Sequence, residues 1–506
     1  MTNYYAYPYI LLTGGGDGAL DSLDGSLIKD GDWAVVTTNT GVFVYRCNAT
    51  SAAAESSPAV ISPDSNAGDK RWILMSFGGV FGTTATSGAI SFVQAGTGAV
   101  SRTMLAKSKE IFSVTDFGAV GDGPSNTNDQ AAIQAAIDAA EAANCGFVYF
   151  PKSVAGYRID SGLTIEKSGV VLVGDGPKSA ILCPTFNTDA IVTFGGTASL
   201  VEDTGMRGMG IVHIGTRNAG NTFAFGRNLA RCCLENVSVS AAFNLLAYGS
   251  AAYPLETSDC TLRNFHGQGT GDGIICTNQA SLFLEHCRIN GTAGNNTRGI
   301  KLPYAFDGLW LDSETTIETH DNSFEIVHAA GSVANIFLNG CAFDRPLVAA
   351  LRINISGTAV INGVYVNGLK IYDTVGSGDT DGILVENSGS GGIDGIELRN
   401  VSARDLRQRF ANFNAVVTNL LIQGCQSLRG GLKNANTYAG IELNSLAHDH
   451  VNITNNRIGS QHKYGISNAL NSTNIIITGN DFVDGDSAST NNMGSTSSTR
   501  IITNNI

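Results

Sequence analysis

A short phrase recurs through the C-terminal half of this 506-residue chain and limits what it can fold into. It reads an aliphatic residue, any residue, usually Asn or Gly, a small or apolar residue, any residue, and usually another apolar residue, as in LRNVSA (398–403). Marked by the third residue, the copies are Asn236, Asn264, His286, Gly340, Gly368, Asn400, Gly424, Asn455, Gly479 and Asn504. Successive marks lie 22 to 32 residues apart, except for one interval of 54 (340 − 286), or two steps of 27 with a degenerate copy near residues 315–324. Such a period indicates a repeat architecture.

The phrase also predicts the kind of repeat. Its aliphatic and polar positions alternate, as in a strand with one buried face. Asn or Gly at the third position tolerates the positive φ of a turn. Between copies there is no helical periodicity, only short β-rich runs broken by Gly, Asn, Ser and Asp. Two or three short strands per ~25 residues form one coil of a parallel β-helix, in which stacked coils share one core. Leucine-rich horseshoes have a similar period, but their spaced leucines and helical segment are missing here.

Composition excludes several classes of function. The net charge of −13 disfavours nucleic acid as a partner, because phosphate binding requires a basic patch, whereas it is compatible with a polysaccharide. The ten cysteines form no CxxC pair, and Cys287, Cys341 and Cys425 share one inward position of the repeat. This pattern predicts core thiols in a reducing compartment rather than disulfides or metal ligands. We expect neither a metal nor a cofactor.

The N-terminal residues 1–105 differ in pattern from the rest. Strand candidates at 33–38, 41–46 and 71–77 predict a small β domain, followed by a loop or hairpin region at 78–98 and a linker. Residues 1–13 lack the basic and apolar regions of a signal peptide, and no apolar stretch approaches the ~20 residues of a membrane span. We therefore expect no export signal and no membrane insertion.

Residues 106–165 predict the start of the β-helix. Asn128 or Asp129 is a plausible N-cap for one amphipathic helix. Its apolar stripe has helical spacing: Ile133, Ala136, Ile137 and Ala140. Strands are expected at 147–150 and 157–159. A glycine turn, a helix and then strands suit the first coil of a solenoid, where the open core must be covered.

This segment resembles a known family. The runs FGAVGDG (117–123), VYFP (148–151) and YRI (157–159), with the helix between them, resemble the first segment of the pectate-lyase-like right-handed β-helix superfamily. Residues 163–165 and 170–176 look like its first coils. The resemblance is close over about 60 residues, and later coils match in pattern only. It implies an all-β fold: a right-handed, single-stranded parallel β-helix with one N-terminal capping helix, preceded by a small β domain.

Within that superfamily, the small N-terminal domain, the expected lack of a signal peptide and the DFGAVGDG motif resemble bacteriophage tail spikes. This resemblance implies a homotrimer in the virion, assembled in the host cytoplasm, that binds and usually degrades a bacterial surface polysaccharide. Residues 1–105 would attach to the phage tail or baseplate, residues 106–165 would start the β-helix, and residues 166–506 would bind and cut the substrate. The sequence stops inside a copy of the repeat, so we expect a further domain, the trimer or the loop 484–498 to cover the last strand edge.

Carboxylates recur at one corner of three consecutive coils. Asp373 and Asp405 lie five residues beyond the marks of their coils, and Asp344 lies four beyond. Since coils stack at ~4.8 Å, neighbouring carboxylates would start about 5 Å apart and alternate ones ~9.6 Å apart. Glycosidases use separations of ~5–5.5 Å (retaining) or ~6.5–9.5 Å (inverting), with one carboxyl acting as the general acid. Arg345 and Arg404 are candidate substrate-binding cations. The alternative is that these aspartates only stabilise turns.

A second acidic cluster lies where the repeat phrase degenerates. Its candidate catalytic carboxylates are Asp312, Glu314 and Glu318. Trp310, Tyr304 and His320 are candidate substrate-binding residues, because an aromatic ring can stack on a sugar. Glu318 precedes Asp344 by about one coil, which predicts that both clusters line one groove. The alternative is a solvated loop with core aromatics.

Three functions remain open at this point. The first is a tail-spike glycosidase that cuts capsule, O-antigen or exopolysaccharide. The second is a lyase on the same scaffold, which requires a uronic acid, a basic residue and often Ca²⁺, for which Asp373, Asp379 and Asp381 are candidate ligands. The third is a non-catalytic adhesin or structural spike.

Overall fold

The computed structural model describes residues 8–503, except for residues 15, 40, 67, 76–89, 145, 188, 197–198, 250–256, 278, 293–295, 373–379, 434–436, 445–446, 460–461, 468–470, 483–487 and 492–499. The chain divides into two compact units, Met1–Glu110 and Ile111–Ile506. No helix within the described ranges has the length and apolar character needed to cross a membrane.

The first unit is built on a five-stranded sheet around Tyr45 and Trp72, whose side chains are buried. Its strands, in sheet order, are β1 (Pro8–Tyr9), β2 (Trp33–Thr38), β3 (Gly41–Asn48), β5 (Arg71–Leu74) and β4 (Val60–Ile61), with the short helix η1 (Leu20–Ser22) beside them. The three expected strands are present, although the end of the third, at 76–77, lies outside the described residues.

The end of this unit contains a helix that the sequence did not predict. The antiparallel pair β6 (Ser91–Phe92) and β7 (Arg102–Thr103) leads into α1 (Met104–Ser108). Thr103 caps α1, because its hydroxyl oxygen accepts a hydrogen bond from the backbone N–H of Ala106 at 3.0 Å. Most of the expected loop or hairpin region 78–98 lies outside the described residues.

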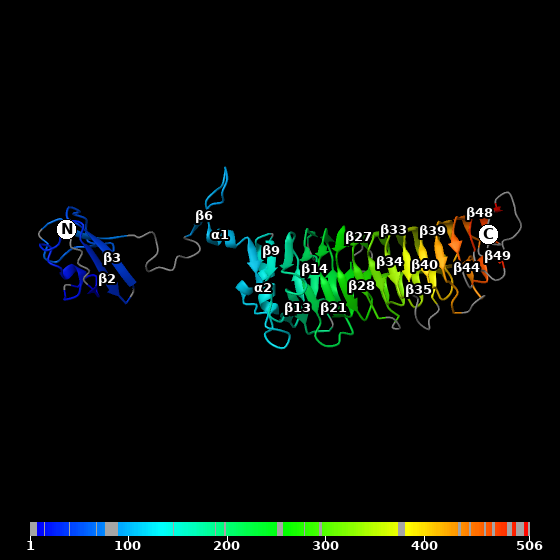
Figure 1. Ribbon diagram of the computed structural model, residues 1–506, viewed down its shortest axis with the longest axis horizontal. Helices are drawn as coiled ribbons and strands as arrows, with labels where there is room; N and C mark the ends of the chain where they lie inside the picture. The colour runs from blue at the N-terminus through cyan, green and yellow to red at the C-terminus, as the bar shows by residue number, and fades with distance from the viewer. Residues whose placement is uncertain are drawn as a thin grey trace. The chain divides into compact units, whose positions relative to one another are not determined.

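The second unit starts with the predicted helix. After η2 (Val114–Phe117), α2 (Gln130–Ala142) covers the open end of the stack of coils (Figure 1). All four residues of its predicted apolar stripe are fully buried. Asp129 is the N-cap, but its carboxylate accepts hydrogen bonds from the backbone N–H groups of Val120 (2.7 Å) and Gly121 (3.1 Å). Asp129 therefore fixes the glycine turn against the helix.

The coils that follow form three long parallel sheets, and most coils contribute one strand to each sheet (Figure 1). The fifteen-stranded sheet contains β8 (Ile111–Ser113), β9 (Gly146–Phe150), β12 (Val170–Gly174), β16 (Gly205–Arg207), β20 (Cys233–Glu235), β24 (Cys260–Arg263), β27 (Gln279–Glu285), β30 (Phe306–Leu311), β33 (Ser332–Asn339), β36 (Val360–Asn367), β39 (Ile393–Arg399), β42 (Thr418–Gln423), β45 (Asp449–Thr454), β48 (Thr473–Thr478) and β50 (Arg500–Thr503). The twelve-stranded sheet contains β10 (Tyr157–Ile159), β13 (Ile181–Pro184), β17 (Gly210–Val212), β21 (Ser238–Ala242), β25 (His266–Gly269), β28 (Arg288–Asn290), β31 (Thr316–Glu318), β34 (Ala342–Asp344), β37 (Lys370–Tyr372), β40 (Ser402–Arg404), β43 (Gln426–Leu428) and β46 (Arg457–Ile458). The thirteen-stranded sheet contains β11 (Leu163–Ile165), β14 (Val192–Phe194), β18 (Asn221–Phe225), β22 (Asn244–Tyr248), β26 (Ile274–Cys276), β29 (Arg298–Leu302), β32 (Asn322–His328), β35 (Ala349–Ile355), β38 (Asp381–Asn387), β41 (Ala411–Asn414), β44 (Ala439–Glu442), β47 (Tyr464–Ser467) and β49 (Ala488–Asn491). A short three-stranded sheet joins β15 (Val201–Glu202), β19 (Leu229–Ala230) and β23 (Thr257–Ser258).

The recurring phrase is the turn from the fifteen-stranded to the twelve-stranded sheet. Every described third residue, from Asn236 to Gly479, has a φ between 48° and 69°. Side chains link turns of adjacent coils, as where Asn400 Nδ2 donates to Asn367 Oδ1 at 3.1 Å. The degenerate coil turns at Glu314 (φ 69°), so its copy starts at Leu311, a few residues before the predicted position. The copy is degenerate because its turn has one additional residue. The strand pairs Leu284–Leu311 and Arg288–Thr316 enclose three residues in the preceding coil and four in this one.

The inward residues of all coils form one continuous apolar core. Cys287, Cys341 and Cys425 are buried in it, as predicted from their shared repeat position. The nine described cysteines are all free thiols. Burial raises the pKa of the Cys341 thiol to about 12, so this group packs as a small apolar side chain.

Candidate active site

A groove of about 660 Å³ lies on the outer face of the twelve-stranded sheet. It crosses three successive strands, β31, β34 and β37. In each of them the middle residue is buried in the core, and the outer two lie on the opposite face of the strand. The outer residues of β34 and β37 are at least partly exposed, whereas Glu318 in β31 is buried. The lining residues are Ser313, Glu314, Thr316, Gly340, Ala342, Asp344, Lys370 and Tyr372.

Asp344 lines the groove, and a second carboxylate, that of Glu318, lies beside it without being among the lining residues. Glu318 and Asp344 are direct register partners in β31 and β34, so their backbones are one strand spacing apart, ~4.8 Å. The Glu318 side chain is 10% exposed and the Asp344 side chain 26% exposed. Glu318 and Asp344 are therefore neighbours on adjacent coils, as expected from the 26 residues, about one repeat, that separate them.

Two arginines hold this pair. Arg288 contacts Glu318 Oε1 at 2.8 Å, and Arg345 contacts Glu318 Oε2 at 3.4 Å. Arg345 also contacts Asp344 Oδ2 at 3.2 Å. The cluster thus has two positive and two negative charges, and Arg345 bridges the two acids. This arrangement positions both carboxylates and places cationic groups where an acidic sugar could bind.

The other predicted carboxylates do not all join this pair. Glu314 lines the same groove at its turn side, and its Oε2 lies 3.5 Å from His286 Nε2. Asp312 lines a different hollow of about 200 Å³ across the turn, beside Phe283 and Trp310.

Farther along the axis, the predicted row of aspartates does not continue in register with Asp344. The register partner of Asp344 is Tyr372, and Asp373 lies outside the described residues. Asp405 lies two coils beyond Asp344, at a turn position with a φ of 61°, and pairs with Arg429 at 2.5 Å. Arg404 is 3.8 Å from Asp405 and belongs to that separate cluster.

The predicted aromatic and histidine contacts need correction. His320 is 1% exposed and packs against Gly291 and Gly299 inside the coil, so it cannot touch a polysaccharide. Tyr304 is exposed, but it lies between β29 and β30, away from the residues that line the groove. The ring of Trp310 is stacked between Phe283 and Phe337, with centroid distances of 4.6 and 5.7 Å. Since both of its faces are covered, it has no face left for a sugar.

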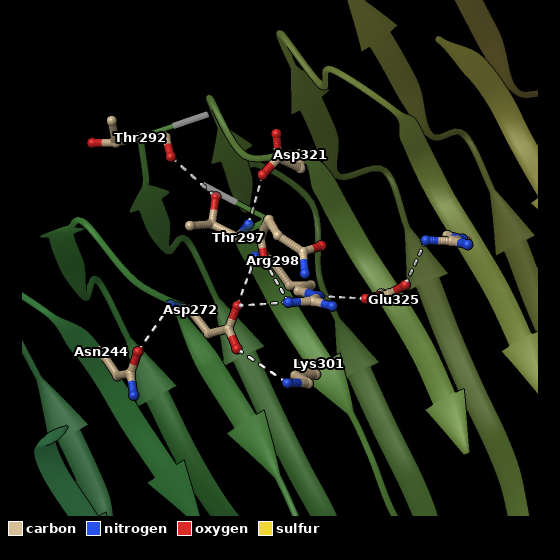
Figure 2. A network of polar contacts seen from close by, with 10 residues as sticks. Asn244, Asp272, Thr292, Thr297, Arg298, Lys301, Asp321 and Glu325 are labelled. Carbon is tan, nitrogen blue, oxygen red and sulfur yellow. Dashed lines mark hydrogen bonds and ion pairs between the residues drawn. The ribbon is translucent and has the colours of Figure 1, made fainter. Parts of the chain in front are cut away.

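A second polar network, which the sequence did not reveal, lies on the thirteen-stranded sheet. Figure 2 shows Arg298 beside Asp272 and Glu325, and Arg298 Nε lies 2.5 Å from Glu325 Oε2. Glu325 also contacts Arg352 at 3.2 Å, and its side chain is 1% exposed. The signal was present in the spacing: Arg298 and Arg352 each lie 27 residues from Glu325, which is one repeat. All charges in this network are paired, which makes it a structural ladder.

In the described part of the chain, no group of three His, Cys, Asp or Glu side chains is arranged to hold a metal ion. Of the candidate Ca²⁺ ligands, Asp373 and Asp379 lie outside the described residues. The Asp381 carboxylate is buried and accepts hydrogen bonds from the Arg409 N–H and from Asn412 Nδ2, both at 2.9 Å. Burial raises the pKa of Asp381, which disfavours the ionised form that a cation needs.

Comparisons with known proteins agree with this fold. Residues 111–342 match the family model of rhamnogalacturonase A/epimerase, pectate lyase-like. The chain folds as a right-handed parallel β-helix, and the matched residues place its first half beside the pectate-lyase-like families. The tailspike protein of E. coli bacteriophage HK620 superposes with a TM-score of 0.50 and 14% identity, over 81% of this chain and 83% of that one. The pre-mature gene product 12 of bacteriophage phi29 superposes with a TM-score of 0.53 and 16% identity, over 76% of this chain and 54% of that one. The predicted resemblance to phage tail spikes is therefore confirmed at the level of the fold.

Curated relatives match over shorter segments. Mannuronan C5-epimerase AlgE4 of Azotobacter vinelandii is 38% identical over 104 residues, 19% of this chain and 18% of the relative. Alginate lyase 7 of the same organism is 44% identical over 77 residues, 14% of this chain and 8% of the relative. This chain therefore spans less than a fifth of the length of these relatives.

Proposed function

We propose that this protein is a phage or prophage tail spike that binds a bacterial surface polysaccharide in the groove over Glu318 and Asp344 and depolymerises it. The similarity to tail spikes and to enzymes named for alginate and mannuronan supports a polysaccharide as the substrate. In this proposal the protein is a homotrimer in the virion, and the unit Met1–Glu110 attaches it to the phage tail or baseplate.

The observation that carries the proposal is the register of Glu318 and Asp344. Their backbones are one strand spacing apart, ~4.8 Å, which allows the carboxyl separation of ~5–5.5 Å that a retaining glycosidase uses. Asp344, the more exposed of the two, protonates the glycosidic oxygen as the bond to the anomeric carbon breaks. Glu318, which two guanidinium groups hold, is the carboxylate that attacks that carbon or stabilises its positive charge. Water then takes the place of the leaving sugar, and its proton returns to Asp344.

A lyase is the second candidate, because the groove contains cations that hydrolysis does not need. Lys370 lines the groove beside Asp344 and supplies the basic residue that the sequence left unassigned. Arg288 and Arg345 would neutralise the carboxylate of a uronic acid, which makes the neighbouring C–H more acidic. Lys370 would then remove that proton and the glycosidic oxygen would leave, giving an unsaturated sugar without consuming water.

The test uses the host polysaccharide and assays the release of reducing ends by the full-length chain. Asp344→Asn and Glu318→Gln are each expected to lower the rate by 10²- to 10⁴-fold, the range for loss of a general acid or base. Asp394→Asn is the matched control, since this aspartate lies on the fifteen-stranded sheet, where its carboxylate accepts a hydrogen bond from Asn419 Nδ2 at 2.7 Å. Full activity in both groove variants would refute the site.

A second measurement separates the three functions. Growth of absorbance at about 235 nm, which marks an unsaturated product, would favour the lyase, and Lys370→Met should then abolish it. Reducing ends without that absorbance would favour the hydrolase. Binding without any release of reducing ends, in a correctly folded protein, would leave the adhesin.

A further inference from the structure

An almost uncharged row of outward-facing residues runs along the whole fifteen-stranded sheet. It contains one residue per strand, from Ile111 in β8 to Ile501 in β50, and each residue is the register partner of the next. Glu397 is the one charged member of this row, which we call the outer row. The strands that carry it, among them β27, β33, β39 and β48, follow one side of the solenoid (Figure 1).

The middle of the outer row is a stack of four aromatic rings. Phe283, Trp310, Phe337 and Tyr365 are stacked at centroid distances of 4.6, 5.7 and 5.0 Å, with interplanar angles of 10°, 9° and 15°. Each ring is only half-buried, although the faces of the inner two are covered by their neighbours. The solvent therefore meets ring edges, which form an apolar ridge, and few of the ring faces that sugars prefer.

Glycines let the rings lie against the strands. A Cβ at Gly308 would come within 2.5 Å of the Trp310 ring, and one at Gly363 within 2.7 Å of the Tyr365 ring. Both glycines have a positive φ, 84° and 87°. The backbone thus leaves room for the rings of Trp310 and Tyr365 to lie over the glycines of their own strands.

Beyond the stack, the outer row contains the polar residues Thr261, Glu397 and Asn452, and its two ends are apolar and more exposed. Ile111 and Phe147 are 51% and 49% exposed near one end, and Ile476 and Ile501 are 39% and 52% exposed near the other. Charged residues stand in the neighbouring row instead, where they pair with one another, as Arg263 does with Glu285 at 2.6 Å. An apolar centre with a polar rim is the usual composition of a protein interface.

The length and spacing of the outer row indicate its partner. Fifteen strands at ~4.8 Å extend over about 67 Å, and a contact about 10 Å wide would cover about 700 Å², close to the ~800 Å² per partner of a standard interface. A compact globular partner cannot follow a straight line of this length. A second copy of the chain has the same straight row with the same spacing between coils.

We propose that the outer row is the contact between copies of this chain, packed side by side and parallel, so that each residue of the row meets its counterparts. This inference rests on the proposed self-assembly and gives it a surface. It does not depend on the groove being catalytic, because the groove lies on a different sheet.

Disulfide trapping tests the geometry. In a Cys233→Ser background, which removes the native thiol of the outer row, Ile476→Cys should give a covalent dimer of chains on mild oxidation. Leu428→Cys, an equally exposed apolar position on the twelve-stranded sheet, should give none. A dimer that forms only when Ile476→Cys chains are mixed with Phe147→Cys chains would mean antiparallel packing and would overturn the proposal.

Sedimentation tests the energetics. The wild-type chain should sediment as an oligomer at micromolar concentration, and Trp310→Glu should shift it to a monomer with an unchanged β-rich circular dichroism spectrum. Leu428→Glu should leave the oligomer intact. A monomeric wild type, or an oligomer that survives Trp310→Glu together with a failed trap at Ile476, would overturn the proposal. An assembled wild type that releases no reducing ends would instead contradict the proposed function alone.

Discussion

The same four coils carry opposite chemistry on two of their faces. On the fifteen-stranded sheet, Phe283, Trp310, Phe337 and Tyr365 stack ring on ring. On the thirteen-stranded sheet, charges alternate in sign over the same coils: Arg298, Glu325, Arg352 and Glu386, with closest contacts of 2.5, 3.2 and 2.8 Å. Both ladders repeat once per coil, so each uses the strand spacing to bring identical positions together.

The difference lies in what a neighbour must supply. A ring is stabilised by another ring, so the aromatic ladder has like residues at successive positions. A buried charge requires an opposite charge, so the ionic ladder alternates. The aromatic ladder leaves apolar ring edges in contact with water. In the ionic ladder, Glu325 is buried and forms ion pairs with Arg298 and Arg352. This contrast is why we assign an assembly role to the first face and a structural role to the second.

Breaking the ionic ladder should have the largest effect. In Glu325→Leu, Arg298 and Arg352 lose the carboxylate between them, and the free energy of unfolding should fall by about 3 kcal/mol, typical of breaking a buried pair. Urea unfolding measures this loss. Glu386→Gln removes a more exposed carboxylate at the end of the same ladder and should cost less than about 1 kcal/mol. Equal losses in the two variants would show that burial does not set the strength of this ladder.

A backbone substitution beside the aromatic ladder should disrupt its ring stacking. In Gly308→Ala, the new Cβ meets the Trp310 ring at 2.5 Å in a left-handed conformation, and the two costs together should destabilise the protein by about 2.5 kcal/mol. Thermal unfolding and the near-ultraviolet signal of the stacked tryptophan report the change. Gly392→Ala is the control, since a Cβ there meets nothing within 4 Å and its φ is not in the left-handed range. A neutral Gly308→Ala would mean that the ring moves freely.

The free energy of unfolding should depend on pH through His320, by about 2 kcal/mol. His320 lies in the turn between β31, at the groove, and β32, which carries Glu325 of the ionic ladder. Burial lowers the pKa of His320 to about 3, from 6.5 in the unfolded chain. Its contribution to stability is therefore complete above pH 6.5 and is lost as the pH falls towards 3. Between pH 6.5 and 5 the loss amounts to about 2 kcal/mol. His320→Leu should remove this part of the pH dependence in urea unfolding at pH 7 and 5, whereas His286→Leu, at an exposed turn, should not.

Much of the fold could be predicted from the sequence, because the repeat constrains it locally. The third residue of each phrase needs a positive φ, and Asn and Gly mark those positions openly. The stripe of α2 has helical spacing and is fully buried. The degenerate copy was misplaced because Glu314 stands where Asn or Gly was expected, and the additional residue in that turn shifts the pattern.

The candidate site was predictable only where it followed the repeat. Glu318 and Asp344 are one coil apart, and the spacing found them. His320 failed because periodicity places a residue on a coil without telling which way its side chain points after a turn. Trp310 was expected to face a sugar, but Phe283 and Phe337, each 27 residues away, cover its faces. A search for chemically related residues one repeat apart would have found both ladders.

The smallest effect is expected at the turn that separates the aromatic face from the groove. Asn400 has a φ of 52°, and its Nδ2 donates to Asn367 Oδ1 at 3.1 Å. Asn400→Ala loses this bond and places a residue with a Cβ but no local polar partner in the left-handed region, so it should cost about 1 kcal/mol. Asn400→Gly also loses the bond but relieves the backbone, and should cost only a few tenths of a kcal/mol. If urea unfolding gives the two variants the same loss, the hydrogen bond between the side chains of adjacent coils stabilises this turn, and the backbone conformation does not. The two faces are then joined by hydrogen bonds between coils instead of by the local preference of each turn.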